Sequence, residues 1–220
     1  QLAAESMLFE AVFDQIKYAP KTIDCVFVCT PIELVAETIM TASNHIDSPC
    51  IFTDVASVKE AIVNAVDLRK NGHVFIPGHP MAGTEHVGFA SSTDSIFTNS
   101  SYILIQTTDD HSVLKAFLEA LEVNVVETDA LTHDKMIALA SHFPYVVTTL
   151  LMSVVADLSE QDRQLFKQLM GPGFKDTTRI AASSPEWGYD VCQNNLKNVN
   201  ELLTIFENNI NLVKGKLNQD

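Results

Sequence analysis

Three short apolar runs, each followed by polar residues, constrain the fold of this chain more than any other feature. The runs cover residues 22–29, 50–53 and 73–77, and helical patterns follow the first two at 30–41 and 57–68. Apolar runs that alternate with helices are typical of a parallel sheet whose strands are buried on both faces. The sequence therefore predicts a parallel α/β domain, and the functional crevice of such a domain lies beyond the carboxyl ends of its strands.

Polar residues follow all three runs, at the same edge of the predicted sheet. Thr30 comes after the first run, Ser57 after the second and His79 after the third. Thr30 with Glu33, and Ser57 with Glu60, also fit capping boxes, so helix capping alone would explain the two hydroxyl groups. The two roles are compatible, because a capped helix N-terminus still presents amides to a ligand. Their convergence favours a site at this edge.

The segment 78–85 (GHPMAGTE) holds one histidine among glycines and a proline. A rigid loop at the end of a strand is where an α/β fold holds a reacting group, and histidine titrates near neutral pH. A single histidine with turn residues is a weak motif, better explained by an ordinary turn when taken alone. With Thr30 and Ser57 at equivalent strand ends, His79 becomes the candidate for proton transfer.

The remaining patterns complete a first domain, which we place at residues 1–128. Residues 1–18 have helical spacing, so the chain is expected to open on a helix. A strand, a helix and a second strand are expected after the histidine loop, at 102–106, 112–121 and 123–127.

The second half of the chain, 129–220, has helical periodicity only. A long pattern over 131–158 is interrupted by Pro144, and a proline inside a helix removes a hydrogen bond and kinks it. A shorter helix is expected at 162–170 and a last amphipathic helix from residue 184. The apolar stripe of the last helix fits packing on a second copy of the chain or on its own domain.

Two pairs of polar residues in the helical half are candidates for substrate binding. Ser141 and Tyr145 lie four apart beside the expected kink, so they share a face. Hydrogen bonds to the backbone carbonyls that a kink frees would explain them equally well. Lys175 and Arg179 are also four apart, and the fork of an arginine binds both oxygens of a carboxylate. A surface pair that meets nearby acidic residues is the alternative.

Composition excludes several classes of partner. The chain has 28 acidic and 14 basic residues among 220, a net charge of −14, which repels nucleic acids and anionic membranes. Four cysteines without CxxC spacing indicate a reducing, cytoplasmic setting, and seven histidines without ligand spacing give no reason to propose a metal. We find no stretch near the ~20 apolar residues of a membrane span, and no signal peptide.

Six segments of the chain, in order and spacing, resemble the prephenate and arogenate dehydrogenases of tyrosine biosynthesis, the TyrA family. They are 28–31 (VCTP), 54–59 (DVASVK), 78–85 (GHPMAGTE), 133–134 (HD), 141–144 (SHFP) and 174–180 (FKDTTRI). The resemblance implies an incomplete Rossmann-like domain that binds NAD or NADP, followed by an all-helical dimerisation domain. It also implies a cytoplasmic homodimer that acts on a small molecule.

The resemblance implies a role for each candidate residue. His79 would accept the proton of the substrate's ring hydroxyl as hydride passes to the nicotinamide, and loss of CO2 would yield 4-hydroxyphenylpyruvate. Ser57 would form a hydrogen bond with the reacting hydroxyl or the nicotinamide, and Thr30 and Pro31 would line the binding site of the cofactor. Arg179 would bind the side-chain carboxylate of the substrate. Further substrate contacts would come from Lys175, Ser141, Tyr145 and Lys59, with Trp187 and Glu85 as weaker matches.

The chain departs from the family pattern in two places. The family begins with a strand and a GxGxxG turn that cradles the cofactor pyrophosphate, and neither is in this sequence. We therefore expect a truncated chain, inactive by itself, with activity in a longer protein. The alternatives are an arogenate dehydrogenase and a non-catalytic dimerisation or ligand-sensing module. Tyr145 also stands where many members carry histidine, so the resemblance does not extend to inhibition by tyrosine.

Overall fold

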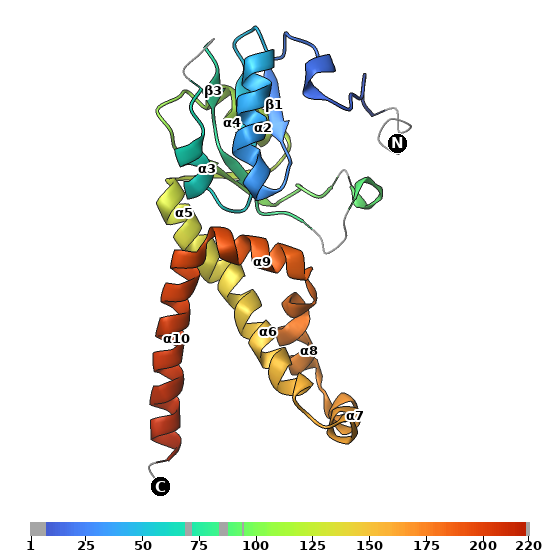
Figure 1. Cartoon of the computed structure of the whole chain (residues 1–220), viewed down its shortest axis with the longest axis vertical. Helices are drawn as coiled ribbons and strands as arrows, with labels where there is room; N and C mark the ends of the chain where they lie inside the picture. Colours follow the sequence, from blue (N-terminus) through green and yellow to red (C-terminus); the bar gives the residue numbers. More distant parts are fainter. Residues whose placement is uncertain (1–7, 69–71, 84–87, 94, 219–220) are drawn as a thin grey trace. The chain divides into compact units, whose positions relative to one another are not determined.

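The computed structural model describes residues 8–68, 72–83, 88–93 and 95–218 (Figure 1). Its two compact units are Gln1–His133 and Asp134–Asp220. The first unit is α/β and the second is helical, so the predicted fold class is confirmed.

The three apolar runs form a parallel sheet. Strands β1 (Cys25–Val28), β2 (Ile51–Asp54) and β3 (Val74–Phe75) pair in the order β1-β2-β3. Strands β1 and β3 are shorter than their apolar runs and β2 is shifted by one residue, but the parallel pairing is as predicted. The carboxyl ends of the three strands therefore lie at one edge, where Val28 is in register with Asp54.

Helices α2 (Ile32–His45) and α3 (Glu60–Ala65) follow the first two strands. The buried side chains of α2 pack in one apolar cluster with Val28 and Phe52 of the sheet. The predicted capping residues are wrong, because the N-cap positions are Pro31 and Lys59 instead of Thr30 and Ser57, and neither caps its helix through its side chain. Helix α3 begins three residues after Ser57 and ends before residue 68, so it is shorter than predicted.

The histidine segment is a strand and not a loop. Strand β4 (Gly78–Pro80) pairs antiparallel with β5 (Ser101–Ile105), which pairs parallel with β6 (Asn124–Thr128). The order β4-β5-β6 places β4 at an edge, where a proline without an N–H is tolerated. Helix α4 (Ser112–Ala120) links β5 and β6, as the sequence predicts.

The prediction of a helix over residues 1–18 is wrong for the part that the structure describes. Residues 8–15 are not helical, and only the 3-10 turn η1 (Ile16–Tyr18) follows them. Leu8, Val12 and Phe13 stay exposed, so the helical spacing has no surface to pack against. A second 3-10 turn, η2 (Phe89–Ser91), lies between β4 and β5.

The long helical pattern of the second half is confirmed as one continuous stretch with an irregular turn. Helix α5 (Ala130–Ile137) runs into the π-helical turn η3 (Ala138–His142) and then into α6 (Phe143–Ala156). The interruption therefore precedes Pro144, which lies in the first turn of α6, directly after the π turn. A π turn is a known cause of a local distortion in a helix.

The expectation that no stretch approaches a membrane span needs correction. The helix Ala130–Ala156 is long and apolar enough to cross a membrane by length and composition, and 22% of its most apolar window is buried in this chain. A single helix of this kind is weak support for a membrane, because interface and core helices pass the same test.

The rest of the second unit consists of helices, and residues 129–218 contain no strand. These elements are α7 (Glu160–Leu169), α8 (Pro172–Thr178), η4 (Arg179–Ala182), α9 (Pro185–Asn194) and α10 (Leu196–Leu217). Ser184 caps α9 by accepting a hydrogen bond from the backbone N–H of Trp187 at 3.2 Å. The single last helix of the prediction is thus two helices, which separate at Asn195 (Figure 1).

Candidate active site

The backbone at Gly78 approaches its neighbours so closely that no side chain fits there. A Cβ atom added to Gly78 would lie 2.7 Å from Cε1 of Tyr102 and 3.0 Å from the carbonyl oxygen of Asp54. Tyr102 is buried on β5, and this burial raises the pKa of its hydroxyl, with a further contribution from the carboxylate of Asp54. The glycine is therefore required where β4 meets β2 and β5, one residue before His79.

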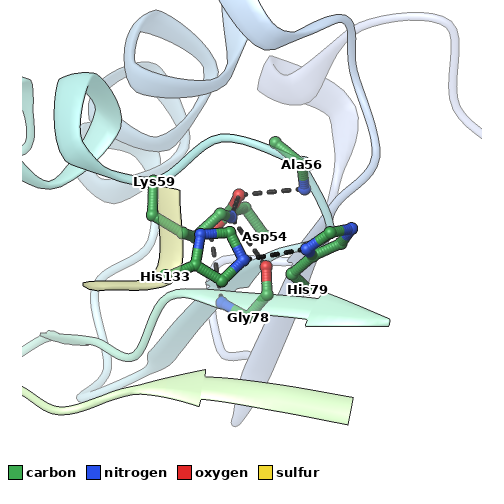
Figure 2. A network of polar contacts seen from close by, with 6 residues as sticks. All are labelled: Asp54, Ala56, Lys59, Gly78, His79 and His133. Carbon is green, nitrogen blue, oxygen red and sulfur yellow. Dashed lines mark hydrogen bonds and ion pairs between the residues drawn. The ribbon is translucent and has the colours of Figure 1, made fainter. Parts of the chain in front are cut away.

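An ion pair in the core, between Asp54 and Lys59, holds this glycine in place (Figure 2). Both side chains are fully buried. Lys59 Nζ donates to a carboxylate oxygen of Asp54 and to the carbonyl oxygen of Gly78, the latter at 2.7 Å. The backbone N–H of Ala56 donates to the same carboxylate at 3.1 Å, and that of Gly78 at 3.4 Å. We call Asp54, Lys59 and Gly78 the lysine clamp.

The imidazole rings of His79 and His133 face each other (Figure 2). Nδ1 of His79 lies 2.9 Å from Nε2 of His133, and the rings meet edge to face with centroids 5.1 Å apart. Both side chains are buried, with relative exposures of 8% and 1%. His79 comes from β4 and His133 from the first turns of α5. A buried histidine held at one ring nitrogen by a second histidine is a group prepared for proton transfer.

Thr30, Pro31 and Ser57 lie where the carboxyl ends of β1 and β2 meet the following turns. Pro31 is exposed at the N-terminus of α2, and Ser57 is half-buried in the turn after β2. Oγ1 of Thr30 is buried and has no hydrogen-bond partner among the described residues. Buried hydroxyl groups normally have partners, so this orphaned oxygen fits a ligand with amide or hydroxyl groups, as a nicotinamide riboside has.

The other predicted substrate-binding residues lie in the second unit. Lys175 is in α8 and Arg179 begins η4, and both side chains are exposed. Ser141 is half-buried in the π turn. Tyr145 is half-buried in α6 and packs edge-on against Trp187, with ring centroids 5.4 Å apart.

Gly188 lies under the ring of Tyr145, because a Cβ atom there would come within 2.2 Å of that ring. In the first unit the structure brings Lys59 to the strand of His79. The candidate Glu85 lies outside the described residues.

A second buried polar network, in the helical unit, centres on Asn195 between α9 and α10. Nδ2 of Asn195 donates to the carbonyl oxygen of Asp134 at 2.8 Å and lies 3.2 Å from Nδ1 of His142. Its Oδ1 accepts from Nδ2 of Asn198 at 2.7 Å. The network joins the turns around the π helix to the start of α10.

Four of these residues had no predicted role: Asp54, His133, His142 and Asn195. The segments 54–59, 133–134 and 141–144 contain the first three, so the resemblance was the available signal. Asn195 carried no signal in the sequence. Among the described residues, no three histidine, cysteine, aspartate or glutamate side chains are grouped as a metal site would require.

Comparisons with known proteins give one family for both units. Residues 3–127 match the model for the nucleotide-binding domain of prephenate dehydrogenase, and residues 129–220 match the model for its dimerization domain. The prephenate dehydrogenase of Bacillus subtilis (strain 168) is 34% identical over 178 residues, which are 77% of this chain and 47% of the relative. The chain thus spans about half the length of that relative.

Two solved structures are similar over nearly the whole chain. The prephenate dehydrogenase from Aquifex aeolicus, in complex with hydroxyphenyl propionate and NAD+, has a TM-score of 0.85 and 28% identity over 98% of this chain and 77% of that chain. The arogenate dehydrogenase of Synechocystis has a TM-score of 0.83 and 30% identity over 98% of this chain and 78% of that chain. Because the two family models together match nearly every residue, the chain belongs to the prephenate dehydrogenase family, as its motifs predicted.

Proposed function

We propose that the protein containing this chain converts prephenate to 4-hydroxyphenylpyruvate and CO2, with transfer of hydride to NAD+ or NADP+. It would act in the cytoplasm in tyrosine biosynthesis. The observation that carries the proposal is the geometry of His79, a buried imidazole whose backbone is fixed by Gly78 and the lysine clamp. The match to a nucleotide-binding domain and the NAD+ bound to the Aquifex relative support the cofactor.

The chain's own residues would bind and orient the substrate and the nucleotide, and they would move one proton. Nε2 of His79 takes the proton of the ring hydroxyl, which lets the electron pair of the O–H bond form a carbonyl as hydride leaves the same carbon. The ring carboxylate then departs as CO2, its bonding electrons complete the aromatic ring, and the former carbonyl oxygen takes a proton back from His79 to become the phenol hydroxyl. A bound nicotinamide nucleotide supplies the hydride acceptor. Thr30, with its orphaned hydroxyl, and Pro31 and Ser57 at the neighbouring strand ends, would hold that nucleotide.

The basic residues of the second unit would hold the substrate through its side-chain carboxylate. Arg179 is exposed and offers a planar fork that suits two carboxylate oxygens. Lys175, Ser141 and Tyr145 would add hydrogen bonds. Lys59 would act on the substrate only through the backbone that it holds, because its ammonium group already binds Asp54 and Gly78.

The protein would be a homodimer through its helical unit, residues 129–220, with residues 1–128 as the partial nucleotide-binding domain. The match of residues 129–220 to a dimerization domain supports this. Helix α10 exposes Ile205, Leu212 and Leu217, and α6 exposes Val154. An apolar surface of this kind on two helices is typical of a contact with another chain.

An arogenate dehydrogenase is the second candidate, because the Synechocystis enzyme is as similar to this chain as the Aquifex enzyme. One assay distinguishes the two activities. The natural protein is given prephenate or arogenate with NAD+ or NADP+, and formation of the reduced cofactor and of CO2 is measured. Turnover of neither acid would overturn the proposal and favour a non-catalytic module.

The role of His79 is tested by His79→Asn in the natural protein. We expect kcat to fall by about 10²- to 10⁴-fold, the usual contribution of a general base, while the affinity for the nucleotide stays within about twofold. His73→Asn is a matched control, because His73 is also buried in the first unit, where its ring binds the carbonyl of Ser43 and packs edge-on against Phe52. Near-normal turnover of His79→Asn would exclude it as the base.

A further inference from the structure

We infer that His133 is a positioning residue for His79: it accepts the Nδ1 proton of His79 and so leaves Nε2 of His79 able to take a proton. The inference rests on the proposed function, and it adds a residue for which the sequence analysis gave no role. It starts from the 2.9 Å contact between Nδ1 of His79 and Nε2 of His133.

A contact of this length between two ring nitrogens holds one hydrogen, which belongs to one ring or the other. If Nδ1 of His79 donates, the neutral ring of His79 has a lone pair on Nε2 and can act as a base. If Nε2 of His133 donates instead, the proton of neutral His79 sits on Nε2 and the base is lost. The proposed chemistry therefore requires the first arrangement, in which His133 carries its own proton on Nδ1.

Asp129 holds the start of the helix that carries His133. The N–H of His133 donates to the carbonyl oxygen of Asp129 at 2.9 Å, in the first turn of α5. The carboxylate of Asp129 accepts from the N–H of Thr132 at 2.9 Å and caps the same turn. Because Asp129 binds the helix start in both ways, rotation of the helix that carries His133 is restricted. His79 is fixed from the other side through Gly78.

The charges near the pair explain why a neutral acceptor suits this site. Titratable groups near His79 include His133 on α5 and, on the far side of Gly78, the Asp54–Lys59 pair and Tyr102. Asp54 and Lys59 carry opposite charges and bind each other. A neutral imidazole can thus orient His79 without the strong attraction for imidazolium that a carboxylate exerts.

The test compares His133→Leu with His133→Gln in the natural protein. Leucine removes the acceptor, so we expect kcat to fall about 10- to 100-fold with KM within about threefold. The acid limb of the kcat/KM profile should move to lower pH by about half a unit or more, because imidazolium loses its acceptor. The amide oxygen of glutamine reaches the place of Nε2, so His133→Gln should restore most of kcat and the position of the limb.

Controls separate positioning from folding. His73→Leu removes another buried histidine of the first unit and should leave the acid limb unmoved. The inference is overturned if His133→Leu keeps the wild-type kcat and profile, or if glutamine is no better than leucine.

A substrate-free readout separates the inference from the proposed function. In protein with 15N-labelled histidine, the side-chain spectrum should show His79 protonated on Nδ1 and bonded to Nε2 of His133. The opposite tautomer would overturn the inference even if prephenate is turned over. The expected tautomer in a protein that turns over neither acid would overturn the proposed function and leave the positioning geometry supported.

Discussion

Gly78 is the residue on which the position of His79 depends most directly, because Lys59 and Asp54 bind its backbone and the ring of Tyr102 and the carbonyl of Asp54 leave no room for a Cβ atom. In Gly78→Ala the new methyl group would overlap the ring of Tyr102 at 2.7 Å and the carbonyl of Asp54 at 3.0 Å. We expect the free energy of unfolding to fall by about 1–3 kcal/mol, the usual cost of overpacking. Denaturant unfolding measures this change.

Gly83→Ala is the control for that measurement. A Cβ atom at Gly83 meets nothing within 4 Å, so the free energy of unfolding should change by no more than about 0.5 kcal/mol. Equal losses in the two variants would contradict the view that Gly78 is required by its contacts.

Arg179 should matter for binding the substrate and little for the chemical step. In Arg179→Gln we expect KM to rise several-fold to several-hundred-fold, for about 1–3 kcal/mol of lost charge-assisted bonding, with kcat nearly unchanged. Steady-state kinetics with the preferred acid measure both constants. Arg163→Gln is the control, because its guanidinium binds the carbonyls of Ala156 and Leu158. An unchanged KM would remove Arg179 from the site.

At the scale of single residues, position along the chain predicted part of the site. Thr30, Ser57 and His79 were proposed because each follows an apolar run. Thr30 and Ser57 do follow the carboxyl ends of β1 and β2, whereas His79 lies in β4 of the second sheet, and the roles of all three stay predictions. The pairing of His79 with His133 joins residues 54 apart, and no local pattern encodes a contact of that kind. Lys59 was predicted to contact the substrate, and a lysine is so rarely buried that its pairing with Asp54 could not be expected.

Among the elements, strands with a continuous apolar run were predicted well and those built from turn residues were not. Strand β4 contains glycine and proline, which favour loops in isolation, and it exists because β5 offers a partner along residues 102–104. The predicted N-terminal helix failed for the opposite reason. Its spacing is helical, but a short helix without a surface to cover is unstable in water.

The junction of α9 and α10 depends on a single buried side chain. Asn195→Leu would leave the carbonyl of Asp134, the amide of Asn198 and Nδ1 of His142 without the groups that now bind them. We expect a loss of about 1–3 kcal/mol in the free energy of unfolding, because unsatisfied buried polar groups keep their desolvation cost. Denaturant unfolding followed by circular dichroism checks this value.

A neighbouring asparagine provides the control for the junction. Asn200 is exposed on α10, so Asn200→Leu should change the free energy of unfolding by no more than about 0.5 kcal/mol. A similar small change in Asn195→Leu would show that the helix junction does not need its network.

The whole molecule combines a strongly acidic composition with exposed apolar side chains on its helical unit. Two copies of a chain with a net charge of −14 repel each other, so a stable dimer needs an apolar contact large enough to outweigh that repulsion. We expect sedimentation to show a dimer. In Leu212→Lys the dissociation constant of the dimer should rise by about tenfold or more.

The control for the dimer lies in the first unit. Val113 on α4 is 68% exposed against 58% for Leu212, so Val113→Lys adds the same charge to a similarly exposed apolar site. It should leave the dissociation constant unchanged. Equal effects of the two variants would mean that added charge alone, and not the surface of α10, changes the association.

The π turn at Ala138–His142 has a consequence for how sequences of this kind are aligned. A π turn holds about one residue more than an α-helical turn, and one residue corresponds to about 100° of rotation in an α-helix. The additional residue therefore sets the direction in which every side chain of α6 points around the helix axis. A one-residue deletion in Ala138–His142 could leave an unbroken helix and yet turn Thr148 from the interior toward solvent. A change of one residue in the length of this helix would keep the helix intact but would rotate the side chains that follow it.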